Sequence, residues 1–156
     1  MEWKDIQRLA AAGESETVEF KKSTAQLPRA GETLCAFLNG QGGQVLIGVT
    51  SAGKLVGQQV SDATLRDIAA SLDKLEPPAR ISIQRIPLDP GKEIVVLDAP
   101  ESRGSMPFTF RGRAYWRVGS TTSIMPQEEY QRLLLDRAHS QRRWENEPAV
   151  GVELDE

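Results

Sequence analysis

Carboxylates and lysines lie close together near the N-terminus. Glu14, Glu16 and Glu19 fall within six residues, and Lys21 and Lys22 follow shortly after. Two carboxylates on a rigid element beside a basic patch can bind a divalent cation, and that cation can activate water for phosphodiester cleavage. Most acidic side chains, however, are simply solvated on protein surfaces. The spacing alone therefore leaves a metal site and a solvated acidic surface both open.

A second group of chemistry-bearing residues lies at 113–118. Alternate side chains of a strand share a face, so Arg113, Tyr115 and Arg117 are expected on one face, opposite apolar neighbours. Two guanidinium groups roughly 6–7 Å apart match adjacent phosphates of a nucleic acid, and the tyrosine between them can stack on a base. Arginines on a solvated strand, or arginines paired with a neighbouring carboxylate, give the same pattern. The stretch therefore predicts a basic, aromatic face that serves either nucleic-acid binding or solubility and ion pairing.

The glycines at 40–43 do not fit a phosphate-binding loop. A P-loop needs a strand, a glycine-rich loop and a helix in that order, with Lys and Ser or Thr after the glycines. Here Gly42 and Gly43 lie between a predicted helix and a predicted strand, so we expect them to reverse the chain with a positive φ. A Ser-His-Asp triad is not indicated either, because the only histidine, His139, falls at the end of the last predicted helix.

Hydrophobic periodicity predicts the elements that position these residues. Apolar residues at helical spacing predict helices from Trp3 to just before Gly13, around 34–39, over 61–75 and from 125 onward. Alternating or continuous apolar runs predict strands at 17–21, 44–49 and 54–56, and a hairpin over 81–97 that turns at 90–91. A second hairpin is predicted to pair 108–110 with 113–118 about Gly112.

Composition limits the class of protein. The chain has 156 residues, of which 39% are hydrophobic and 26% charged, as is ordinary for one globular domain. The net charge of -3 excludes nucleic-acid binding by bulk charge, so a local basic patch is required. One cysteine and the lack of a long apolar run predict a protein of the reducing cytoplasm with no membrane partner. We expect one domain over 1–140, followed over 141–156 by a linker or the start of a truncated C-terminal region.

Five short motifs occur in an order that resembles the Schlafen Alba-like domain. They are E-S-E-T-V-E-F-K-K at 14–22, A-F-L-N-G-Q-G-G at 36–43, L-I-G-V at 46–49, K-L-V-G at 54–57 and A-Y-W-R-V-G-S at 114–120. Each motif alone is common, but the ordered set is fairly specific and spans about residues 13–137. The resemblance implies a compact α+β domain, in which helices flank a mixed sheet, and it agrees with the predicted order of elements. This family is often called a DNA-binding or divergent AAA domain.

The resemblance also implies a wider context. In bacteria such domains commonly precede a winged-helix or other regulatory region. This implies a nucleic-acid-binding module of a regulatory or defence protein, such as a transcriptional regulator.

The resemblance also implies a role for the acidic cluster. In the Schlafen proteins that cleave transfer and ribosomal RNA, two glutamates five residues apart combine with an aspartate that follows I-G-V. Glu14 and Glu19 match the first two positions, but Thr50 stands where the aspartate is expected. Mg²⁺ and Mn²⁺ favour several oxygen ligands, so two carboxylates should bind them weakly.

Two functional hypotheses from different classes follow. One is a nucleic-acid-binding module for DNA or RNA that needs no cofactor to bind and uses Lys21, Lys22, Arg113, Tyr115 and Arg117. The other is a Mg- or Mn-dependent endoribonuclease acting on structured RNA such as transfer RNA, with Glu14 and Glu19 as its catalytic and metal-binding residues. Thr50 in place of the aspartate favours the first hypothesis. The sequence leaves open whether the protein forms a homodimer.

Overall fold

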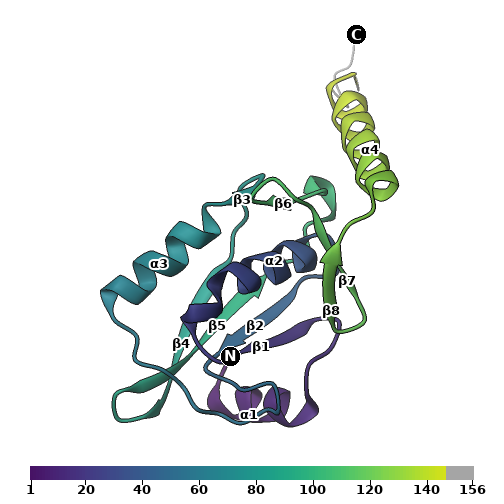
Figure 1. The fold of residues 1–156 in the computed structure, drawn as a ribbon. Helices are drawn as coiled ribbons and strands as arrows, with labels where there is room; N and C mark the ends of the chain where they lie inside the picture. Colours follow the sequence, from purple (N-terminus) through teal and green to yellow (C-terminus); the bar gives the residue numbers. More distant parts are fainter. Residues whose placement is uncertain (147–156) are drawn as a thin grey trace, which may run out of the picture.

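A four-stranded mixed sheet lies at the centre of the computed structural model, which describes residues 1–146 (Figure 1). The strand order is β1-β2-β5-β4. β1 (Val18–Lys21) runs parallel to β2 (Gly43–Ile47), whereas β5 (Lys92–Ala99) runs antiparallel to both β2 and β4 (Ser82–Asp89). The predicted α+β class and the predicted hairpin over 81–97 are therefore confirmed.

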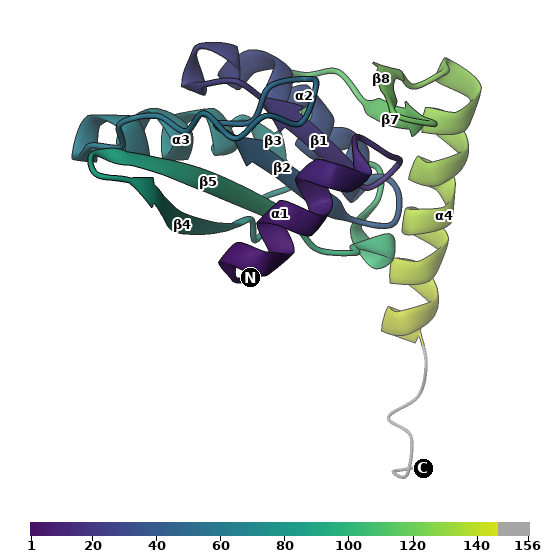
Figure 2. The same cartoon turned by 90° about the horizontal axis from the view of Figure 1, so that it is seen from below.

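Helices cover both faces of this sheet. α1 (Trp3–Ala12) lies on one face, and α2 (Leu27–Leu38) and α3 (Asp62–Leu72) lie on the other (Figure 2). Two short 3-10 helices, η1 (Thr24–Gln26) and η2 (Arg103–Ser105), occupy connecting segments. The flanking helices predicted from apolar periodicity are thus present.

The central strands have continuous apolar sequences because they are buried on both faces. In β5, Val95 and Leu97 pack on the side of α2, whereas Ile94 and Val96 pack on the side of α1. All four are at most 2% exposed. At the sheet edge, β1 buries only alternate residues, which leaves its other side chains to line a surface site.

Local signals set several element boundaries as predicted. Gly13 has a φ of 90° and its N–H donates to the carbonyl of Leu9, ending α1. Ser61 caps α3 by accepting a hydrogen bond from the N–H of Thr64. Gly42 has a φ of 84°, and a Cβ there would lie 2.7 Å from the carbonyl oxygen of Ala99, so only glycine fits this chain reversal.

The predicted second hairpin is wrong in its pairing. β6 (Thr109–Phe110) pairs with β3 (Leu75–Glu76), and β7 (Tyr115–Val118) pairs with β8 (Thr121–Ile124). The chain does reverse at 111–112, but its ladder is a single bridge between Phe110 and Arg113.

The reason for the different pairing is burial. The side chain of Phe110 is 1% exposed and its ring packs where Gly31 of α2 leaves no room for a Cβ. Segment 108–110 therefore belongs to the core, and β7 pairs with the strand that follows it. The strand expected at 54–56 is likewise reduced to one bridge between Val49 and Leu55.

α4 (Gln127–Asn146) begins after Pro126 and runs away from the sheet (Figures 1 and 2). It continues past 141, where the sequence pattern was expected to end, and the remainder of the expected linker, 147–156, lies outside the described residues. None of the described helices combines the length and apolar character needed to span a bilayer.

Candidate nucleic-acid interface

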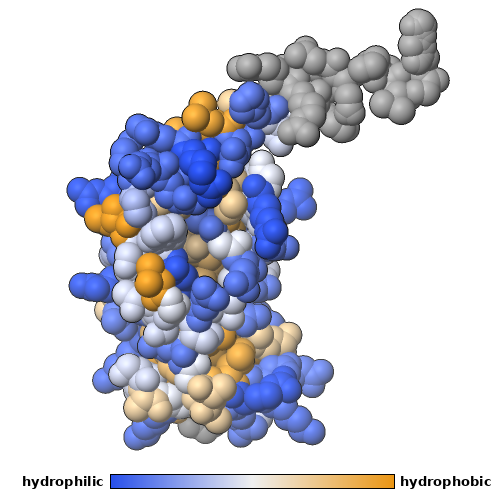
Figure 3. Space-filling model, turned by 90° about the vertical axis from the view of Figure 1, so that its right-hand side faces the viewer, coloured by the Kyte–Doolittle hydropathy of each residue, from blue (hydrophilic) through white to orange (hydrophobic). Residues whose placement is uncertain are grey.

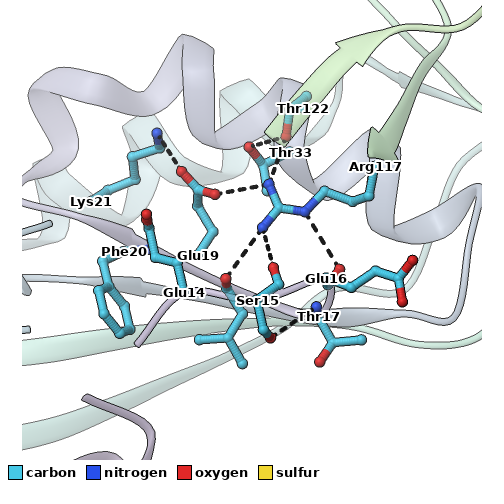
Figure 4. A network of polar contacts seen from close by, with 11 residues as sticks. Glu14, Ser15, Glu16, Thr17, Glu19, Phe20, Lys21, Thr33, Arg117 and Thr122 are labelled. Carbon is cyan, nitrogen blue, oxygen red and sulfur yellow. Dashed lines mark hydrogen bonds and ion pairs between the residues drawn. The ribbon is translucent and has the colours of Figure 1, made fainter. Parts of the chain in front are cut away.

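A polar groove lies between the edge strand β1, helix α2 and the turn of the β7–β8 hairpin. Its volume is about 230 Å³. Its lining combines carboxylates, cations and hydroxyl groups, namely Glu19, Lys21, Arg29, Glu32, Thr33, Ser120, Thr121 and Thr122. We call this feature the β1–α2 groove. The hydroxyls of Thr33 and Thr122 lie 3.0 Å apart and join α2 to the hairpin beside it (Figure 4).

Glu19 is held between two cations at one wall of this groove. Its Oε1 lies 2.8 Å from a guanidinium nitrogen of Arg117, and its Oε2 lies 2.9 Å from Nζ of Lys21 (Figure 4). The side chain of Glu19 is 12% exposed, that of Arg117 is 5% exposed and that of Lys21 is 11% exposed. Lys21 and Glu19 share a face of β1, as predicted, and the structure adds Arg117 to them.

Arg117 fastens the β7–β8 hairpin to the segment before β1. Its guanidinium donates to the carbonyl oxygens of Ser15, Glu16 and Val18. It also donates to the hydroxyl of Thr122 and lies 5.0 Å from the ring centroid of Phe37. All of its donors face protein groups rather than solvent. Of the two roles that the sequence left open for this face, Arg117 therefore takes that of an ion-pairing arginine, because this part of the hairpin packs against β1 and α2.

Tyr115 shares that inward face. Its ring packs against the core under α2, and its hydroxyl lies 3.5 Å from Oε2 of Glu32. Burial raises the pKa of Tyr115, and the charge of Glu32 raises it further. Tyr115 is therefore half-buried, with its ring against the core, and its expected role in base stacking stays a prediction.

The two carboxylates predicted to bind metal are already engaged by protein groups. Both oxygens of Glu19 accept from cations, and Oε2 of Glu14 accepts from the N–H of Phe20 at 2.9 Å. The hydroxyl of Thr50 accepts from the N–H of Lys54 in a tight turn. Among the side chains that the structure describes, no group of three or more His, Cys, Asp or Glu is arranged to hold a metal ion. These residues do not fit a Mg²⁺ or Mn²⁺ site.

The remaining predicted cations are exposed. Lys22 follows β1, and Arg113 lies at the end of the hairpin opposite its turn. Arg29, which sequence reasoning missed, lies on α2 at the groove. None of the three forms an ion pair with another residue in the described part of the chain.

Asn39 explains how the hairpin is anchored from its other side. Its amide nitrogen donates to the carbonyl oxygens of Phe108 and Tyr115, at 3.0 and 2.8 Å, and its Oδ1 accepts from the N–H of Phe108. The A-F-L-N-G motif could have indicated this role, since an Asn at a helix end often bonds to backbone. Asn39 and Arg117 together hold β7 against α2.

The surface around the hairpin is largely hydrophilic, with separate apolar spots (Figure 3). A larger open hollow of about 870 Å³ lies elsewhere, between 59–61 and the β4–β5 turn. Lys92 is the one cation among the lining residues of this hollow, which also include prolines and aliphatic side chains. Glu93, another lining residue, forms an ion pair with Arg85. The β1–α2 groove, although smaller, gathers more of the groups that bind phosphate.

Comparisons with known proteins agree with this fold. The family model described as Schlafen, AlbA_2 matches residues 14–126. One similar solved structure is the N-terminal domain of a protein from Nitrosomonas europaea that is described as an ATP-dependent DNA helicase RecG-related protein. It is 26% identical to this chain, with a TM-score of 0.57, and the match covers 81% of this chain and 96% of that domain.

A second solved structure shares the fold at lower identity. It is the DIP2311 protein of Corynebacterium diphtheriae, which is 15% identical with a TM-score of 0.57 over 86% of this chain. This chain spans only 27% of that protein's length. No curated protein is significantly similar in sequence.

Proposed function

Because this chain belongs to the Schlafen, AlbA_2 family, we propose that it is a nucleic-acid-binding module whose β1–α2 groove contacts the phosphate backbone. The family membership and the likeness to a domain of a protein named after DNA helicases support a nucleic-acid-related role. The groove supplies the local chemistry for it.

The chemistry of the groove wall carries this proposal. Arg29 is exposed and forms no ion pair within residues 1–146, and hydroxyls from α2 and from the hairpin turn lie around it. Arginine, lysine, serine and threonine side chains are among the groups with which proteins contact phosphates. The groove thus holds one free guanidinium beside several groups that can donate a hydrogen bond to phosphate oxygens.

The lining of the groove carries two cations and two carboxylates, although the whole chain is acidic. Lys21 and Arg29 face Glu19 and Glu32, and Glu19 is paired both with Lys21 and with the buried Arg117, which is not part of the lining. The other carboxylate, Glu32, lies near the hydroxyl of Tyr115. Since the chain as a whole carries a net charge of -3, binding depends on this local surface rather than on the field of the whole molecule.

We propose binding without cleavage and without a cofactor. A metal at Glu14 and Glu19 would have to displace Lys21 and Arg117 from Glu19, and Thr50 adds no anionic oxygen. Hard divalent cations need several oxygen ligands to be held firmly.

One assay tests this function directly. Labelled transfer RNA and duplex DNA are incubated with the protein, with and without Mn²⁺, and both retention on a filter and strand cleavage are measured. We expect retention that survives removal of divalent cations, falls in Arg29→Ala, and occurs without cleavage. Cleavage that requires Mn²⁺ and disappears in a folded Glu19→Gln variant would instead establish the nuclease hypothesis.

A further inference from the structure

A second pocket lies at the opposite end of the β7–β8 hairpin from the β1–α2 groove. It has a volume of about 280 Å³ and is formed by the 111–114 turn, the end of β8 and the first turns of α4. Its lining comprises Gly112, Arg113, Ala114, Ile124, Met125, Gln127 and Tyr130. We call it the α4 pocket.

The floor of this pocket is apolar and is held in place by packing. Ala114 and Met125 are at most 9% exposed and pack with the buried Leu133 of α4. The N–H of Met125 donates to the carbonyl of Ala114 at 2.9 Å, and this bond joins the two chain segments that form the floor of the pocket. Tyr130 packs against the same cluster and also lines the pocket, so its ring is held in place while part of it stays accessible.

Three polar residues join the apolar floor in lining the pocket, and their side chains have no partner among the described side chains. The guanidinium of Arg113, the side-chain amide of Gln127 and the hydroxyl of Tyr130 form no hydrogen bond or ion pair in the part of the chain whose side chains the structure describes. An apolar pocket with a few convergent polar groups is typical of a ligand site. The backbone of Arg113 is fixed by two hydrogen bonds to Phe110, so its side chain starts from a defined point.

We propose that the α4 pocket receives one unpaired nucleobase of a single-stranded nucleic acid. In this arrangement Tyr130 stacks on the base, Gln127 bonds to the base edge and Arg113 binds the adjacent phosphate. The inference rests on the proposed function and names its ligand class.

Single strands fit this pocket better than duplexes for a physical reason. The bases of a duplex are stacked on one another, so their ring faces are not available to a side chain, whereas unpaired bases can stack on an aromatic ring. A ligand with phosphates alone would use Arg113 but would leave the apolar floor of the pocket and the ring of Tyr130 uncovered.

The test separates stacking from charge. Fluorescence anisotropy measures the affinity of the protein for a short oligothymidylate, for a sugar-phosphate strand of equal length without bases, and for a duplex. The variants are Tyr130→Ala, Tyr130→Phe and, as a control on the exposed face of α4, Leu135→Ala. Circular dichroism confirms that each variant is folded.

We expect the wild type to prefer oligothymidylate over the base-free strand by about 5- to 150-fold, the range for stacking of one base. Tyr130→Ala should remove this preference without changing affinity for the base-free strand, whereas Tyr130→Phe and Leu135→Ala should keep it. Equal preference in Tyr130→Ala and wild type would overturn the α4 pocket alone. Failure of the wild type to bind any of the three ligands would overturn the proposed function itself.

Discussion

At the scale of single residues, Arg117 has a structural role that its strand position hides. Its loss would leave the largely buried Glu19 beside a single cation and would remove one hydrogen-bond donor from each of three backbone carbonyls. We expect Arg117→Ala to lower the free energy of unfolding by about 3–5 kcal/mol, as for other broken buried pairs. Arg117→Lys should recover only part of this, because an ammonium group cannot reproduce the guanidinium fork.

Urea denaturation measures this effect, and Arg113→Ala serves as the control. Arg113 is exposed and unpaired within the described residues, so its replacement should change stability by no more than about 0.5 kcal/mol. Equal stability of Arg117→Ala and Arg113→Ala would show that Arg117 does not hold the hairpin.

Cys35 gives a prediction for the pH dependence of stability. Burial raises the pKa of this thiol to about 12. Its ordinary value is near 9, so between pH 9 and 12 the unfolded chain loses the proton that the folded chain keeps. Stability contributed by the neutral thiol is therefore complete below pH 9 and lost as pH rises toward 12.

The comparison of wild type with Cys35→Ala isolates this titration from those of lysines and tyrosines. Above pH 9, the unfolding free energy of the wild type should fall more steeply than that of the variant, by about 1.4 kcal/mol per pH unit. Parallel curves would contradict the buried, neutral thiol.

Residue types and their spacing predicted part of the site. Period two correctly placed Glu19 with Lys21 on one face of β1, and Tyr115 with Arg117 on one face of β7. Which face met solvent could not be predicted, because the partner of Arg117 is Glu19, 98 residues away in sequence. Arg29 carried no local signal, since an arginine on a helix is usually a solvated side chain.

At the scale of elements, turn chemistry was predictable where one residue dominates it. Gly42 has a φ of 84°, and a Cβ there would approach the carbonyl of Ala99 to 2.7 Å. We expect Gly42→Ala to cost about 1–3 kcal/mol of stability. Gly40 is the matched control, because its Cβ would meet nothing closer than 3.5 Å and its φ is not positive.

Thermal or urea unfolding of the two variants checks this element. Gly40→Ala should be within about 0.5 kcal/mol of wild type. If both variants lose the same stability, the reversal between α2 and β2 does not depend on the backbone conformation of Gly42.

Strand partners were less predictable than strands. Gly112 does reverse the chain, yet the ladder that continues belongs to β7 and β8, which turn at 119–120. Local alternation identifies a strand, but burial of Phe108 and Phe110 under α2 decides which strand it pairs with. The A-F-L-N-G motif likewise ends a helix by local rules, whereas the bonds from Asn39 to Phe108 and Tyr115 depend on tertiary packing.

At the scale of the whole molecule, an acidic chain presents a groove in which cations and carboxylates balance and Arg29 forms no ion pair with the described residues. The α+β architecture followed from the order of periodic segments, and the family match over 14–126 agrees with it. Charge totals alone would have pointed away from nucleic acid, because the net charge is -3. The central claim is that a few cations beside the β7–β8 hairpin, rather than the whole surface, bind phosphates.

The salt dependence of nucleic-acid affinity tests that claim most directly. Each phosphate neutralised by a protein cation releases counterions, so the logarithm of affinity falls linearly with the logarithm of salt concentration. The slope is measured for the wild type, for Arg29→Ala and for Arg66→Ala, whose exposed arginine lies on α3, on the other side of the molecule from the hairpin (Figure 1). We predict that Arg29→Ala reduces the slope by about one and that Arg66→Ala leaves it unchanged. Equal slopes for Arg29→Ala and the wild type would contradict the β1–α2 groove as the phosphate-binding surface.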